Sequence, residues 1–264
     1  MPDDPKDSVR SQFDRRAAWY AISGIHRQSE GLEELLRLAA PTASDRALDV
    51  ATGTGFTALA LAPRCRRVVG LDMTAGMVRE ACALRSSRGV SNLEFCLGDA
   101  EAIPFVSGAF DLVTCRHAAH HFPHLARAAA EMARVTRPGG RIVLADTCAP
   151  EPDHLAALMN AWEVRRDPSH VVCRPPSRLR VLFREQGLRV DAAVMTQVPL
   201  EFDDWVRRAG VPSDEAAALR IEFLGAPPDA RAAFRIRRDG ADVHFAWDEL
   251  VLLCTRSSGR GSPG

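Results

Sequence analysis

The chain has 264 residues, 46% of them apolar, which is enough to bury the core of one large domain. Its 34 basic and 34 acidic side chains cancel, so the net charge gives no general attraction to nucleic acid or to an anionic membrane. The N-terminus is polar and no apolar run approaches the roughly 18 residues that cross a bilayer, so we expect a cytoplasmic protein that acts on a small molecule, without stable membrane insertion.

Residues 1–40 are predicted to form an N-terminal helical lid. The stretch SQFDRRAAWYAISGIHRQSEGLEELLRLAA has the pattern of two helices that break near Ser23 and Gly24. In the second helix the leucines recur at helical spacing and form one apolar stripe, made of Leu32, Leu35, Leu36 and Leu38. These helices could close over a ligand site.

Strand-like and helical patterns alternate between residues 46 and 147. The apolar runs ALDVA, RRVVGLD, NLEFCLG, FDLVTC and RIVLAD are interspersed with helical stretches such as AGMVREACALRSS and LARAAAEMARVTR. Strands that alternate with helices of about 10 to 15 residues imply right-handed crossovers and a parallel sheet covered on both faces. We therefore predict an α/β fold with a doubly wound sheet, whose ligands bind outside the carboxyl ends of the strands.

The second half of the chain is predicted to continue this core and to interrupt it once. EPDHLAALMNAWEVRR and RLRVLFREQG are helical, and LRVDAAVMTQVPL alternates like a strand. The core is expected to span residues 41–200 and to resume at 241–256 in a final strand pair, ADVHFAW and ELVLLCT. Residues 201–240 would be a helical insertion that caps the substrate side, or alternatively an oligomer contact such as that of a homodimer. Residues 257–264 have the composition of a disordered tail.

The stretch LDVATGTGF at residues 48–56 combines a strand, a tight turn and the start of a helix. Its glycines, Gly53 and Gly55, let the backbone approach a bound group, and the helix N-terminus offers free N–H donors. A polar ligand is therefore expected at this turn.

The loop alone is compatible with two cofactors. Residues 53–58 fit the pattern G-x-G-x-x-A, and Asp72 follows at the end of the next strand, so a dinucleotide and an NAD(P)-dependent oxidoreductase remain an alternative. Asp49, however, places a carboxylate before the turn, where it would repel a pyrophosphate and attract an ammonium or sulfonium group. This charge favours a cationic ligand.

Three further stretches, GDAEAIPF, FDLVTCRHAAHHF and ARVTRPGGRIVLAD, agree with a cationic ligand that carries an adenosine. GDAEAIPF puts Asp99 after the third strand, where it could accept a hydrogen bond from an adenine amine, with Ala100 supplying a backbone N–H. Together LDVATGTG, VVGLDMT, GDAEAIPF, FDLVTCRHAAHHF and RPGGRIVL resemble a class I S-adenosylmethionine-dependent methyltransferase. They are most similar to the branch that contains the ubiquinone and menaquinone biosynthesis methyltransferases. The resemblance covers residues 10–150 and implies a Rossmann-like, mostly parallel sheet of seven strands.

The resemblance implies a site for S-adenosylmethionine, with S-adenosylhomocysteine as product. Asp49 would lie near the ammonium group of the cofactor, the loop 51–55 would wrap its methionine part, and Asp72 would bind the ribose hydroxyls. The implied cofactor residues all lie at or after the carboxyl ends of strands: Asp49, Ala51, Thr52, Gly53, Thr54, Gly55, Asp72, Met73, Asp99, Ala100 and Arg116.

At the other end of the cofactor, Met73 would lie on the adenine, while Asp99 and Ala100 would read its edge. Arg116 and His117, after the fourth strand, would lie near the reactive sulfonium. The chain departs from the family pattern at one point, because the first glycine of the family's loop is Ala51 here. We expect this methyl group to cost little, since the two later glycines are kept.

Histidines cluster after the fourth strand. Methyl transfer is an in-line displacement, and a protonated oxygen or nitrogen acceptor benefits from a base that titrates near neutral pH. His117 and His121 are the first candidates for this base, with packing or cofactor contact as the alternative. A metal site would need three convergent ligands, which neither the histidines nor the seven scattered cysteines supply, so no metal is expected.

The sequence as a whole predicts methyl transfer to a small-molecule acceptor in biosynthesis, at a carbon, oxygen or nitrogen atom, and the family branch suggests an aromatic or quinone-like ring. A protein that binds S-adenosylmethionine without catalysis is the second alternative. RNA is disfavoured as a substrate because the chain is neutral and has no added basic domain. The later aromatic residues either line a substrate pocket or form plain core: Trp162, Trp205, Phe223 and Phe234.

Overall fold

The computed structural model describes residues 6, 10, 12, 14 and 29–257. Its strands are β1 (Arg46–Val50), β2 (Arg67–Asp72), β3 (Leu93–Leu97), β4 (Phe110–Arg116), β5 (Thr136–Cys148), β6 (Leu188–Glu201), β7 (Arg237–Asp239) and β8 (Asp242–Arg256). They form one eight-stranded sheet in the order β3-β2-β1-β4-β5-β8-β6, with β7 paired to β8 beside this path. The first five strands are parallel, and β8 runs antiparallel to both β5 and β6. The predicted α/β class and the mostly parallel sheet are confirmed.

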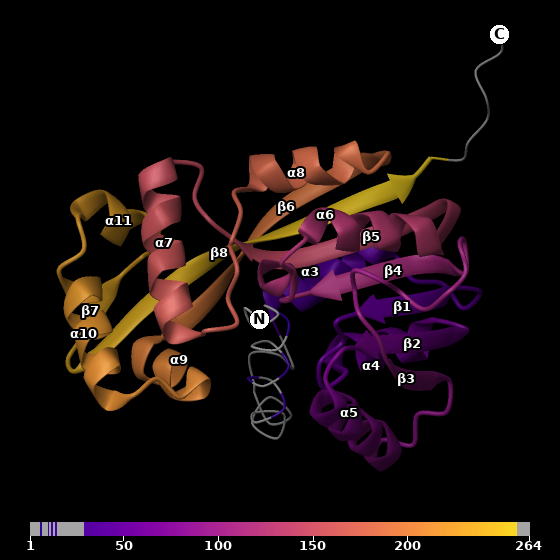
Figure 1. Ribbon diagram of the computed structural model, residues 1–264, viewed down its shortest axis with the longest axis horizontal. Helices are drawn as coiled ribbons and strands as arrows, with labels where there is room; N and C mark the ends of the chain where they lie inside the picture. The colour runs from indigo at the N-terminus through magenta and orange to yellow at the C-terminus, as the bar shows by residue number, and fades with distance from the viewer. Residues whose placement is uncertain (1–5, 7–9, 11, 13, 15–28, 258–264) are drawn as a thin grey trace, which may run out of the picture.

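Helices cover both faces of this sheet (Figure 1). They are α3 (Glu30–Ala39), α4 (Phe56–Leu61), α5 (Ala75–Ser87), α6 (Leu125–Val135), α7 (Asp153–Arg166), α8 (Pro176–Glu185), α9 (Phe202–Ala209), α10 (Ser213–Leu224) and α11 (Pro228–Ala233), with short 3-10 turns at Ala62–Arg64 and Ala119–His121. Helices α3 and α4 share one hydrophobic cluster with the sheet, and α6 and α8 share another on the opposite face.

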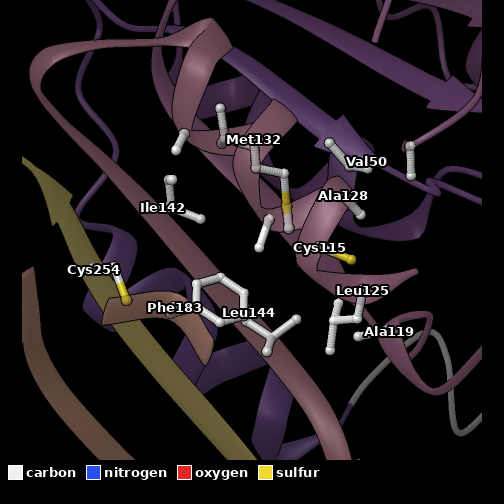
Figure 2. Close-up of a cluster of buried hydrophobic side chains, with 14 of the residues drawn as sticks. Val50, Cys115, Ala119, Leu125, Ala128, Met132, Ile142, Leu144, Phe183 and Cys254 are labelled. Atoms are coloured by element: carbon white, nitrogen blue, oxygen red, sulfur yellow. The ribbon is translucent and has the colours of Figure 1, made fainter. Parts of the chain in front are cut away.

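The strands supply both clusters because successive side chains point to opposite faces. Ile142 and Leu144 of β5 face α6 and α8, whereas Val143 between them packs with α3 and α4. Figure 2 shows the cluster that the sheet forms with α6 and α8, in which Phe183 of α8 and Met132 of α6 lie over β5. Helix α6 fits there because its buried apolar residues recur at helical spacing, at Leu125, Ala128, Ala129 and Met132.

A second unit forms around the outer ends of β6 and β8. These strands stay paired from Leu188 with Arg256 as far as Glu201 with His244, and α7, α9, α10 and α11 gather around their far ends (Figure 1). The unit has its own buried core, rich in aromatic rings: Trp162, Phe202, Trp205, Phe223, Phe234, Phe245 and Trp247. The later aromatic residues are therefore core, and this core includes α7 as well as the predicted insertion 201–240.

The predicted final strand pair is wrong, because ADVHFAW and ELVLLCT form the single 15-residue strand β8. The polar residues between the two apolar runs do not break the strand. Asp248 forms an ion pair with Arg235 at 2.9 Å, and Glu249 is buried with its own partners. Both polar side chains thus have partners, and the strand continues through them.

Only part of the predicted N-terminal lid lies within the described residues. Helix α3 is capped by Ser29, whose hydroxyl accepts from the N–H of Leu32, and it packs on β5, β6 and β8. Most of the first predicted helix and of the C-terminal tail lies outside the described residues. Within the described part of the chain, none of the helices combines the length and the apolar character needed to cross a membrane.

Candidate active site

A pocket lies at the carboxyl ends of β1, β2, β3 and β4. Its walls come from the loops that follow these strands, and they include most of the residues that the sequence pointed to: Ala51, Thr52, Gly53, Thr54, Asp72, Met73, Asp99, Ala100, Arg116, His117 and His121. Phe56, Met77, Phe122 and Pro123 add apolar surface. The doubly wound topology thus brings together side chains from four separate loops.

Asp72 at the end of β2 fixes the shape of the first loop. One carboxylate oxygen accepts from the N–H of Gly53 at 2.8 Å, and the other accepts from the N–H of Thr74 at 2.9 Å. Burial raises the pKa of this carboxyl group, although these two hydrogen bonds favour the charged form. Asp72 therefore joins two loops while lining the pocket.

Two of the implied cofactor residues lie behind the pocket wall. Asp49 is only 1% exposed and accepts from the hydroxyls of Thr52 at 2.6 Å and Thr114 at 2.7 Å. Burial raises the pKa of Asp49 to about 6, and the two hydroxyls oppose that shift. Gly55 precedes α4 with a φ of 87°, and a Cβ there would lie 2.6 Å from the ring of Phe95. Both residues support the loop from behind.

Ala51 adopts the left-handed conformation that usually selects glycine, with a φ of 53°. A methyl group in this conformation costs about 1–2 kcal/mol, more than the sequence led us to expect.

Ala51→Gly is therefore expected to raise the free energy of unfolding by about 0.5–1 kcal/mol, the relief of strain less the added freedom of the unfolded chain. Urea denaturation measures this change. Ala130→Gly at an exposed position in α6 is the control and should instead lose about 1 kcal/mol. A loss of stability in both variants would mean that Ala51 is not strained.

The adenine end of the predicted site carries an unexpected cation. The Nζ atom of Lys6 lies 2.6 Å from Asp99 and 2.8 Å from Glu101, and all three residues line the pocket. Asp14 accepts from the N–H of Gly76, in the first turn of α5, at 2.7 Å. Lys6 thus lines the pocket itself, while Asp14 joins the N-terminal segment to the start of α5.

Arg116 ends β4 and is almost fully buried. Its Nε donates to the hydroxyl of Thr57, in the first turn of α4, at 2.9 Å. Burial lowers the pKa of Arg116, and the carboxylates of Glu249 and Asp49 oppose this by favouring its positive charge. This side chain offers a cation to the pocket at the point where β1 and β4 end.

His117 is bound to a carboxylate that sequence analysis missed. Its Nε2 lies 2.6 Å from Oε1 of Glu249, and the other oxygen of Glu249 accepts from the hydroxyl of Thr196 at 2.7 Å. Glu249 stands 132 residues further along the chain, within an apolar strand. The signal that could have found it is the carboxylate itself, because a buried strand rarely holds a charge without a partner.

The other histidines differ from His117 in their surroundings. His121 lines the pocket, but its Nδ1 lies 3.0 Å from the carbonyl of Ser169, and burial, together with His120, lowers the pKa of His121 to about 4. His120 pairs with the buried Asp146 at 2.7 Å. Of the two predicted bases, His117 has its ring bonded to a buried carboxylate, whereas the ring of His121 contacts the carbonyl of Ser169.

Within the part of the chain that the structure describes, no three His, Cys, Asp or Glu side chains are grouped as metal ligands would be.

The comparisons with known proteins identify the family. Residues 48–144 match the model of a methyltransferase domain. The uncharacterized methyltransferase YcgJ of Bacillus subtilis (strain 168) is 33% identical over 242 residues, which are 91% of this chain and 96% of YcgJ. The chain belongs to the class I S-adenosylmethionine-dependent methyltransferases. The crystal structure of YcgJ has a TM-score of 0.83 with 32% identity, over 87% of this chain and 99% of that one.

Two relatives of this methyltransferase are named after the molecules that they methylate. The nocamycin O-methyltransferase of Saccharothrix syringae is 36% identical over 84% of this chain and 86% of its own length. The demethylmenaquinone methyltransferase of Beutenbergia cavernae is 37% identical over 56% of this chain and 60% of its own length. The methyltransferase domain match ends before Glu249, whereas the alignment with YcgJ covers most of the chain.

Proposed function

We propose that this methyltransferase moves a methyl group from S-adenosylmethionine to a small-molecule acceptor and releases S-adenosylhomocysteine. The observation that carries this proposal is the position of Asp72, which lines the pocket at the end of β2 while both of its oxygens hold neighbouring loops. A carboxylate in this place suits the two hydroxyls of a ribose. The names of the nocamycin and demethylmenaquinone enzymes support a small acceptor, as does the neutral chain.

The other pocket residues fit the remaining parts of the cofactor. The loop 51–54 would surround the methionine part, and Arg116 would pair with its carboxylate because it is the buried cation on that side. Asp99 and Ala100 would meet the adenine edge, with Met73 against the ring. Lys6 would then have to leave Asp99, so we expect the N-terminal segment to move when the cofactor binds.

A calorimetric titration with S-adenosylhomocysteine tests this proposal, with NAD and NADP as controls. We expect micromolar binding of S-adenosylhomocysteine and none of the dinucleotides. Dinucleotide binding without S-adenosylhomocysteine binding would overturn the proposal and favour an oxidoreductase.

A further inference from the structure

We propose that His117 is the catalytic base of this methyltransferase, that the buried Glu249 positions it, and that the acceptor is a small molecule with a weakly acidic hydroxyl of the phenol or enol type. The proposal rests on the proposed function of the pocket. It adds the acceptor class and the residue that orients the base.

The sheet holds the contact between His117 and Glu249 in place. His117 lines the pocket immediately after β4, in the same wall as Arg116. Glu249 lies in the middle of β8 with 0% exposure, and both of its oxygens are engaged, one by Nε2 of His117 and one by the hydroxyl of Thr196. Because Thr196 and Glu249 are directly paired across β6 and β8, the sheet itself fixes the carboxylate.

The charge of Glu249 decides which ring nitrogen of His117 carries the proton. Burial disfavours the charged form of Glu249, but His117, Thr196 and Arg116 outweigh it and lower the pKa of this carboxyl group, which is therefore ionised at neutral pH. An ionised carboxylate can only accept, so Nε2 of a neutral His117 carries the proton and Nδ1 carries the lone pair. The same division of roles lets an aspartate orient the histidine base of serine hydrolases.

The backbone around the pair is specialised as well. His117 has a left-handed φ of 51°, which is uncommon for a residue with a side chain, and its N–H donates to the carbonyl of Ala145 at 2.8 Å. In the first turn of α3, a Cβ on Gly31 would overlap the carboxylate of Glu249. Glycine thus lets the N-terminus of α3, with its partial positive charge, approach this carboxylate.

Two carboxylates and one cation lie close to His117. Glu249 contacts the ring, and Asp146 on β5 lies near enough that His117 contributes to its lowered pKa. Arg116 is the opposing cation, and it is shared between Glu249 and Asp49. His121 is the weaker candidate, because a base with a pKa of about 4 takes a proton from a phenol poorly.

The reaction balances with these groups alone. The proton of the acceptor hydroxyl passes to Nδ1 of His117, and the oxygen electron pair forms the new O–C bond to the methyl group. The S–C bond breaks with its electron pair left on sulfur, which becomes a neutral thioether. The imidazolium beside Glu249 later releases its proton to water.

The first test needs no acceptor. Long-range proton–nitrogen correlation spectra of the histidine rings, recorded on the full chain with S-adenosylhomocysteine, report the tautomer of His117, whose signals are assigned with His117→Asn. We expect the Nε2–H tautomer in the parent protein and a mixture of tautomers in Glu249→Gln. Thr196→Val, which keeps the carboxylate but removes one of its donors, is the milder second variant and should change the spectrum in the same direction.

The second test uses tritiated-methyl S-adenosylmethionine with phenol, catechol and para-nitrophenol. We expect transfer to at least one of them, a loss in kcat of about 100- to 10,000-fold in His117→Asn, and a clear loss in kcat in Glu249→Gln because the ring is no longer held in one tautomer. The losses should be smallest with para-nitrophenol, the most acidic acceptor.

His154→Asn is the matched control, because His154 pairs with Asp229 at 2.8 Å on the exposed surface, and its rate should not change. Binding of S-adenosylhomocysteine without transfer to any of the phenols would overturn the acceptor class. An unaltered rate in His117→Asn would overturn the base, and an unchanged tautomer in Glu249→Gln would overturn the role of Glu249. A parent protein that does not bind S-adenosylhomocysteine would instead contradict the proposed function.

Discussion

Asp72→Ala should weaken the binding of S-adenosylhomocysteine by tenfold or more. The substitution removes the acceptor of two loop N–H groups, from Gly53 and Thr74, together with the carboxylate proposed to bind the ribose. A hydrogen bond to a charged group is worth about 1.5–3 kcal/mol, and each 1.4 kcal/mol is about tenfold in affinity. Calorimetry of the variant beside the parent protein measures the loss.

Two companion variants separate loop support from ligand contact. Asp72→Asn keeps an oxygen for one of the loop amides but loses the charge, so its affinity should fall between those of the parent and the alanine variant. Glu94→Ala on β3 removes an exposed carboxylate that pairs with Arg67 at 2.7 Å, and it should bind normally. Affinity equal to the parent in Asp72→Ala would refute the ribose role.

Phe223→Ala should lower the free energy of unfolding by about 3–5 kcal/mol, the usual cost of emptying a buried aromatic site. Phe223 is 0% exposed, and its ring lies between 4.2 and 5.4 Å, centroid to centroid, from those of Trp162, Phe202, Trp205 and Phe245. Guanidinium denaturation followed by tryptophan fluorescence reports this core directly, because its indoles are in contact with Phe223.

Ile221→Ala is the control on the same helix, since Ile221 is 73% exposed and its loss should change stability by less than about 0.5 kcal/mol. Similar stabilities for the two variants would show that the aromatic cluster is not a packed core. Retention of S-adenosylhomocysteine binding in a destabilised Phe223→Ala would show that the cofactor pocket forms without an intact second unit.

Local signals account for the parts of the fold that could be predicted. The pattern AGMVREACALRSS coincides with α5, and the loop between β1 and α4 shows its glycines in the sequence because positive φ angles select them. The continuity of β8 could not be predicted from such local signals. Asp248 and Glu249 have the local pattern of a break, and only their partners elsewhere in the fold make them compatible with a strand.

The candidate site likewise contains residues that local signals predict and contacts that only the fold creates. Residues such as Asp72 and Asp99 could be placed because each directly follows a strand, and the topology gathers strand ends. The contact between His117 and Glu249 joins the first half of the chain to its last strand, and no short-range pattern records it. The position of Asp49 behind the loop likewise depends on the hydroxyl of Thr114 on the neighbouring strand.

The single strand β8 links the two hydrophobic cores of the molecule. Val243, Phe245 and Trp247 belong to the core of the outer unit, and Leu250 and Leu252 belong to the core of the central sheet, with Glu249 at the junction. Because β8 is one continuous strand, a movement of the outer unit would also shift the carboxylate of Glu249 beside His117. A substitution that reshapes the outer unit would then also change how Glu249 holds the ring of His117.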